Sequence, residues 1–152
     1  MAPESTAPTA ATASTAAEPA APQGSLRRNL PALALVVWTF FVWTTRIGNI
    51  WGDDDLDTAG KVGRTALALS FTVLAAVVLA ALWRGTSPQL RIAVLALAGW
   101  TTAVWVVRDA SILFGDHDTA FKVVHTVLAV VSTALALLAV REEARAPLLA
   151  RT

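Results

Sequence analysis

The sequence WTFFVWTTR at residues 38–46 returns as WTTAVWVVR at residues 100–108, 62 positions further along the chain. Trp, Thr, Val, Trp and Arg occupy the same places in both copies. The correspondence continues downstream with shifts of one residue, since Lys61 matches Lys122. The chain therefore reads as one segment that occurs twice.

The composition is too apolar for an ordinary soluble domain. Of the 152 residues, 55% are hydrophobic and 15% are charged, and the mean hydropathy is +0.58. A helix needs about 20 apolar residues to cross a bilayer core. Four stretches are long enough: Asn29–Trp51, 57–83, Ser87–Phe114 and 118–143. They predict an all-α polytopic membrane protein with four transmembrane helices.

The repeat divides these helices into two hairpins, 29–83 and 87–143. Because each hairpin crosses the membrane twice, both copies have the same orientation, and their symmetry axis runs along the membrane normal. Segment 1–28 is rich in Ala, Pro and Thr and is expected to be a disordered tail. Residues 144–152 are expected to form a short basic tail.

Capping residues predict where the helices begin and end. Asn29 is a candidate N-cap of the first helix, with Pro31 in its first turn. Asp57 and Asp118 are candidate N-caps of the second and fourth helices. Pro147 is expected to end any extension of the fourth helix.

The distribution of basic residues predicts the orientation in the membrane. Seven Lys or Arg residues lie on the side of the chain ends, and five lie on the side of the hairpin connections. The positive-inside rule therefore places both termini in the cytoplasm of a multi-pass protein of the cell membrane. The two acidic connections would then be extracytoplasmic.

Several function classes conflict with the residues present. The net charge of +1 provides no basic field for nucleic acid, and a chain without cysteine has no thiol redox chemistry. The span middles, 32–45, 66–82, 92–107 and 126–140, contain no ionisable side chain for a proton relay. No catalytic, cofactor or metal-ligand motif is present, so we expect no enzyme, cofactor or metal.

Two short patterns imitate known sites. The run DDDLD at 53–57 matches the DDxxD pattern of Mg²⁺–diphosphate sites, but the second copy offers only DHD at 116–118. A solvated acidic loop that caps a helix is therefore favoured. His125 corresponds to Arg64 in the repeat, which leaves no symmetric histidine pair for haem.

A basic cluster is expected at the end of the bundle that holds the hairpin connections, near the outer leaflet. Its members are Arg46, Arg64, Arg108, Lys122 and His125. In one interpretation these side chains extend to the membrane interface and pair with the loop aspartates. In the other they bind an anionic headgroup or a small acid, because guanidinium groups suit phosphate and carboxylate.

Four tryptophans lie deeper than the span ends. They are Trp38, Trp43, Trp100 and Trp105. Trp43 precedes Arg46 by three residues, as Trp105 precedes Arg108, so ring and guanidinium can share a helix face and stack. Packing around the pseudo-twofold axis is favoured over a ligand cage for these rings.

The pattern WTxxVWxxR, then Gly-Asp, then a helix beginning near VHTVL at 124–128, resembles small uncharacterised integral membrane proteins common in actinobacteria. Some of those proteins resemble one Trp-rich hairpin of this chain, which is here duplicated. The resemblance covers residues 31–140. It implies a fold and a broad taxonomic home, and it implies no activity or residue roles.

These patterns predict a non-enzymatic accessory or interaction protein that packs laterally with lipids or with a membrane partner. The basic cluster would contact anionic lipid or that partner. The alternative is a component of a small-anion transporter or channel that works as an oligomer. A conduit needs a polar stripe, and the span middles offer only scattered Thr and Ser. An enzyme acting on lipid comes third.

Overall fold

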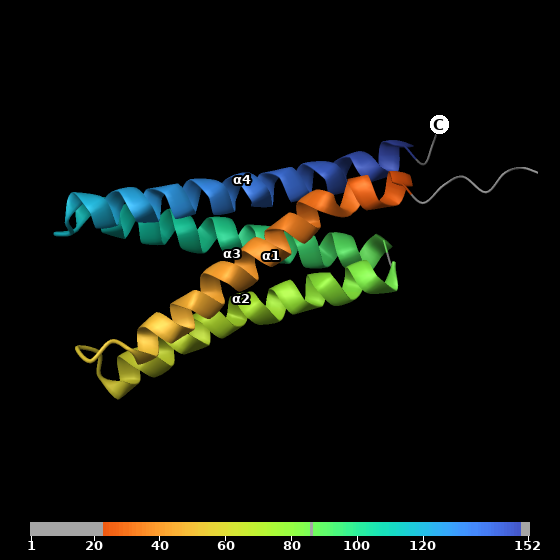
Figure 1. The fold of residues 1–152 in the computed structure, drawn as a ribbon. Coiled ribbons are helices and arrows are strands. Elements are labelled where there is room, and N and C mark those ends of the chain that lie inside the picture. The colour runs from red at the N-terminus through yellow and green to blue at the C-terminus, as the bar shows by residue number, and fades with distance from the viewer. Residues whose placement is uncertain (1–22, 86, 150–152) are drawn as a thin grey trace, which may run out of the picture.

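A computed structural model describes residues 23–85 and 87–149, and within these ranges all regular structure is helical. The elements are α1 (Gln23–Trp51), α2 (Thr58–Arg84), α3 (Ser87–Phe114) and α4 (Thr119–Leu149) (Figure 1). Each helix is long and apolar enough to cross a membrane. The chain is an all-α, multi-pass membrane protein, as its sequence predicts.

The acidic caps lie where they are expected. The side chain of Asp57 accepts a hydrogen bond from the backbone N–H of Gly60 at 2.9 Å. Asp118 accepts one from the N–H of Phe121 at 2.8 Å at the start of α4. At the other end of α2, Gly85 adopts a left-handed conformation with φ 64° and closes the helix.

Two predicted boundaries are wrong because the outer helices are longer than expected. α1 begins at Gln23, so Asn29 is not its N-cap and residues 23–28 are helical. α4 continues to Leu149, so Pro147 lies inside its last turn. A proline removes one backbone donor but does not by itself end a membrane helix. The predictions for residues 1–22 and 150–152 lie outside the described residues.

The helices form a four-membered ring in which α1 packs on α2 and α4, and α3 packs on α4 and α2. Figure 1 shows the two hairpins packed together near the chain ends and splayed apart at their connections. We call the splayed end, which holds connections 52–57 and 115–118, the loop end. The splay separates the tips of the two hairpins and leaves room between them.

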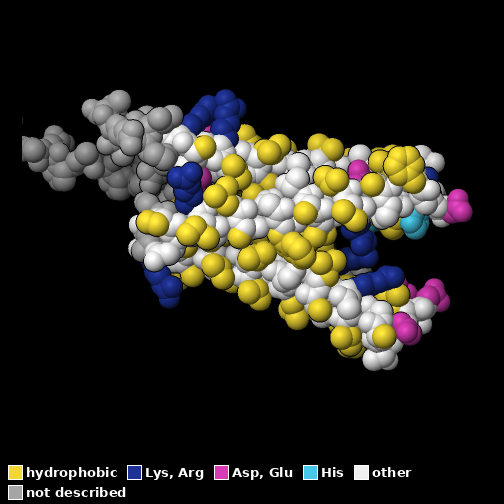
Figure 2. All heavy atoms as spheres, turned by 180° about the vertical axis from the view of Figure 1, so that it is seen from behind, with side chains coloured by type: hydrophobic (Ala, Val, Ile, Leu, Met, Phe, Trp, Pro, Cys, Tyr) yellow, Lys and Arg dark blue, Asp and Glu magenta, His cyan; other side chains and the backbone are white. Residues whose placement is uncertain are grey.

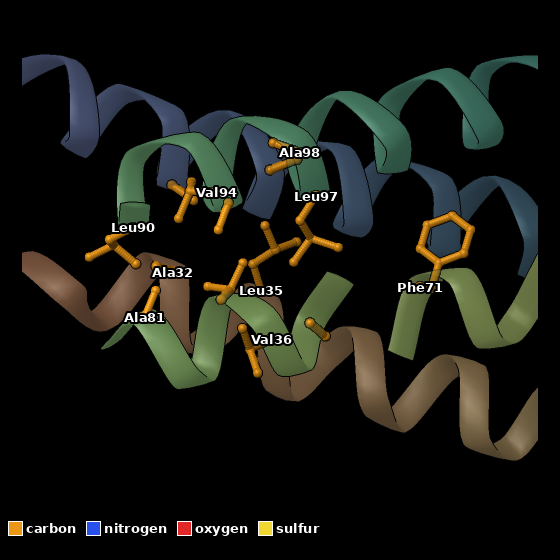
Figure 3. Close-up of a cluster of buried hydrophobic side chains, with 14 of the residues drawn as sticks. Ala32, Leu35, Val36, Phe71, Ala81, Leu90, Val94, Leu97 and Ala98 are labelled. Carbon is orange, nitrogen blue, oxygen red and sulfur yellow. The ribbon is translucent and has the colours of Figure 1, made fainter. Parts of the chain in front are cut away.

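The core lies where the four helices are close together. The side chains of Leu35, Val94 and Leu97 point into the space between the helices (Figure 3). α2 and α4 contribute mainly small residues there, such as Ala75 and Ala136, which allow close helix approach. On the outer surface, by contrast, many large hydrophobic side chains are exposed (Figure 2). Such a surface suits lipid tails.

The buried positions of α1 recur in α3 with a spacing of 62 residues. The pairs are Ala32 and Val94, Leu35 and Leu97, Val36 and Ala98, Thr39 and Thr101, Trp43 and Trp105, and Ile50 and Ile112. The first helix of each hairpin therefore turns the same face inward. The arginines that follow the second tryptophan in each copy reach the loop end together.

Candidate anion-binding cleft

A cleft of about 340 Å³ lies between the hairpins on the loop side of the core. α1, α3 and α4 line it with Phe41, Val42, Trp43, Thr45, Arg46, Asn49, Trp105, Arg108, Phe121, Val124, His125 and Leu128. Figure 2 shows the notch between two lobes, with Lys and Arg side chains inside it and Asp and Glu side chains at the lobe tips. Three members of the predicted basic cluster, Arg46, Arg108 and His125, border this cavity.

Arg46 and Arg108 supply the charge of the cleft. Each is half-buried and lies three residues after a buried tryptophan of its own helix. Their charges act on each other, and the charge of Arg64 on α2 acts on both. Asp53 is an opposing charge near Arg46. The cleft therefore concentrates like charges beside the apolar interior, where water screens them least.

The arginines of the cleft have no carboxylate at contact distance among the side chains described, which are those of residues 29–85 and 88–145. Within that set the ion pair is Arg145 with Glu142, at 2.9 Å and near the opposite end of α4. Direct pairing of Arg46 or Arg108 with a loop aspartate, the first interpretation of the cluster, is absent from these side chains. No described carboxylate therefore competes with another anion for these guanidinium groups.

His125 is fixed in the wall of the cleft. Its side chain is only 9% exposed, and its Nδ1 lies 2.9 Å from the carbonyl oxygen of Phe121. The ring also packs against that of Phe121, with 3.9 Å between centroids. Because a carbonyl only accepts, Nδ1 carries the hydrogen, and Nε2 is the nitrogen left for another partner.

Aromatic rings close the inner end of the cleft. Trp43 stacks on the buried ring of Phe71 at 3.9 Å and 14°, and its centroid lies 6.4 Å from that of Trp105. Among the described residues, the ring contacts of Trp43 are with Phe71 and Trp105, and stacking of Arg46 on this ring stays a prediction. Residues three apart lie on the same helix face, but this spacing does not determine which neighbouring helix packs against the ring.

The other two deep tryptophans lie outside the cleft. Trp38 donates its indole N–H to Ser132 Oγ at 2.9 Å, and Trp100 donates to Ser70 Oγ at 3.0 Å. Each bond joins the two hairpins. These rings hold the bundle together, in agreement with the packing role that the sequence favours.

The structure thus divides the predicted cluster. Arg46, Arg108 and His125 line the cleft, and Arg64 is exposed nearby, whereas Lys122 is not among the lining residues. Sequence reasoning missed Phe121, although its position four residues before His125 puts both rings on one helix face.

Asp109 follows Arg108 in the chain but does not line the cleft. Its carboxylate accepts a hydrogen bond from Thr126 Oγ1 of α4 at 3.1 Å. This bond joins the helices of the second hairpin within the apolar zone. Asp109 instead lines a different surface depression, between α3 and α4.

Comparison of the chain with models of protein families, with curated proteins and with solved structures finds no match.

Proposed function

We propose that this chain is a non-enzymatic accessory protein of the cell membrane, of the actinobacterial hairpin type in duplicated form, whose cleft binds the anionic headgroup of a lipid or of a membrane partner. The observation that carries the proposal is the pair Arg46 and Arg108, half-buried in a cavity and without a carboxylate at contact distance among the described side chains. An anion between them would offset the cost of holding two like charges beside an apolar core.

The lining of the cleft favours an amphiphile over a bare ion. Phe41, Val124 and Leu128 add apolar surface beside the two guanidinium groups. A lipid places a charged group directly above apolar chains, which matches a cavity that is basic toward its mouth and aromatic toward its floor. Arginine is well suited to such a site because its planar fork can bind two oxygens of a phosphate at once.

We further propose that both termini are cytoplasmic, which would open the cleft to the outer leaflet. The support is the excess of Lys and Arg on the side of the chain ends. A homo-oligomer is compatible with this arrangement, since apolar surface remains exposed on all four helices.

The alternative, a component of a small-anion transporter, would need polar groups along the whole span. The buried hydroxyl of Thr39 donates to the carbonyl oxygen of Leu35, and Ser132 accepts from Trp38. These two hydroxyl groups are hydrogen-bonded within the bundle. That of Thr101 has no partner among the described residues, so the support for a polar path is limited to isolated groups.

The proposal can be tested by native mass spectrometry of the full chain extracted in mild detergent. The variant is Arg46→Ala with Arg108→Ala. A matched control, Arg84→Ala with Arg91→Ala, removes two exposed arginines from the other end of the bundle. We expect a co-purified anionic lipid or protein subunit on the wild type and the control, and its loss from the cleft variant. The same retained species on all three would refute the binding site.

A further inference from the structure

We infer that the cleft is built for a phosphomonoester headgroup, a phosphate attached through a single ester bond, and discriminates against the phosphodiester headgroups of most phospholipids. The inference rests on the proposed function and specifies its ligand. It follows from three features of the cleft: its charge, the number of donors it presents, and the free nitrogen of His125.

The first feature is the excess of positive charge. The charges of Arg46 and Arg64 both act on Arg108, whereas Arg46 also has Asp53 as an opposing neighbour. Asp109, beside Arg108 in the chain, is hydrogen-bonded to Thr126 and does not line the cleft. A phosphodiester brings one negative charge, while a phosphomonoester brings about −1.5 to −2 at pH 7. The monoester matches the two arginines of the cleft wall more closely.

The second feature is the number of hydrogen-bond donors. Each guanidinium group can offer two parallel N–H donors to one anion. Arg46 and Arg108 approach the cavity from different helices, α1 and α3. A phosphomonoester has three free oxygens that can serve two such forks, whereas a phosphodiester has two. The third oxygen therefore gives the second arginine a partner of its own.

The third feature is His125. Its Nδ1 hydrogen is directed to the carbonyl oxygen of Phe121, so Nε2 of the neutral ring can only accept. A singly protonated phosphomonoester has a P–OH group to donate to it, and a phosphodiester has none. The same proton can lie on Nε2, which then donates it to the dianion. A monoester thus brings a proton that it shares with Nε2, whereas a phosphodiester brings none.

The primary test uses the wild-type full chain and needs no variant. Equal amounts of phosphatidic acid and phosphatidylglycerol, with identical acyl chains, compete for the detergent-solubilised protein, and the bound fraction is read by native mass spectrometry. We expect a preference for phosphatidic acid on the order of tenfold, the effect of one additional charge-assisted hydrogen bond. Equal retention of the two lipids would overturn the inference.

Two variants separate failure of the inference from failure of the proposed function. Arg46→Ala with Arg108→Ala should lose both lipids. His125→Leu, which fills the same wall with an apolar side chain, should keep lipid binding and lose much of the preference. If both lipids bind equally to the wild type but not to the double variant, the anion site stands and its monoester selectivity is refuted. If the double variant binds both lipids as the wild type does, both the anion site and its selectivity are refuted.

A competition with inorganic phosphate identifies the source of the phosphate group. Displacement of phosphatidic acid by millimolar phosphate, but not by chloride at equal ionic strength, would assign the cleft to a free phosphate. Retention of phosphatidic acid under the same conditions would assign it to a lipid. Displacement by chloride as readily as by phosphate would refute a phosphate-specific site.

Discussion

The indole N–H of Trp38 donates to the hydroxyl of Ser132 at 2.9 Å, and so joins α1 to α4 across 94 positions of sequence. Its counterpart in the other copy, Trp100, joins α3 to α2 through Ser70 at 3.0 Å. The two serines are 62 residues apart, as are the two tryptophans. Both bonds hold the hairpins together on the core side of the cleft, where the helices begin to diverge.

Ser132→Ala should therefore destabilise the bundle. The substitution leaves the indole N–H of Trp38 without its acceptor at a site where Ser132 is only 2% exposed. Hydrogen bonds between membrane helices contribute about 0.6 kcal/mol on average and up to about 1.7 kcal/mol, and this part-buried bond should lie within that range. Denaturation in detergent, followed by tryptophan fluorescence, measures the change.

A double-mutant cycle with Trp38→Phe isolates the bond itself. The two substitutions should be less than additive, because either one removes the same interaction. Additive effects of Trp38→Phe and Ser132→Ala would show that the bond contributes nothing to stability.

Thr39 and Thr101 occupy equivalent buried positions but differ in hydrogen bonding. Thr39 Oγ1 donates to the carbonyl oxygen of Leu35 at 2.7 Å, whereas Thr101 Oγ1 has no partner among the described residues. Thr101→Val should stabilise the protein or leave it unchanged, since it removes an unpaired buried hydroxyl. Thr39→Val should cost about 1 kcal/mol. Thermal unfolding of both variants tests the contrast, and equal destabilisation would contradict it.

The sequence predicts the four helices and their division into hairpins, but it does not predict most contacts between the helices. Apolar length predicts the four spans, and the acidic caps Asp57 and Asp118 fix two starts to within a residue. Asn29 and Pro31 suggest a start that is too late, because a cap motif within a favourable helix has no effect when the helix continues through it. Tertiary packing decides such ends.

The candidate site is likewise predicted in part. The repeat brings Arg46 and Arg108 to one end of the bundle, as the sequence predicts. It does not predict that Phe71 covers Trp43, or that the ring of Phe121 packs on that of His125 in the wall of the cleft. Those contacts depend on how far the hairpins diverge and on the rotation of each helix, which a one-dimensional pattern does not specify.

Asp57→Ala should shorten or loosen the start of α2. The carboxylate caps the helix through the N–H of Gly60, and loss of an N-cap typically costs about 1 kcal/mol. Asp54→Ala, in the same connection, is the matched control, because Asp54 is exposed and its side chain has no hydrogen bond among the described residues. Chemical denaturation should separate the two variants. Equal stability of both would mean that the cap is dispensable.

The natural absence of cysteine makes the orientation directly measurable. Asp54→Cys lies in an exposed connection at the loop end, and Arg84→Cys lies at the exposed end of α2 on the opposite side of the bundle. With both termini cytoplasmic, a membrane-impermeant maleimide should label Asp54→Cys in intact cells and Arg84→Cys only after lysis. Val77→Cys, on the outer face of α2 within the apolar span, is the control that should resist labelling in both conditions. The reverse labelling pattern would place the loop end in the cytoplasm. The cleft of Arg46 and Arg108 would then face lipids of the inner leaflet, and its ligand would have to be sought there.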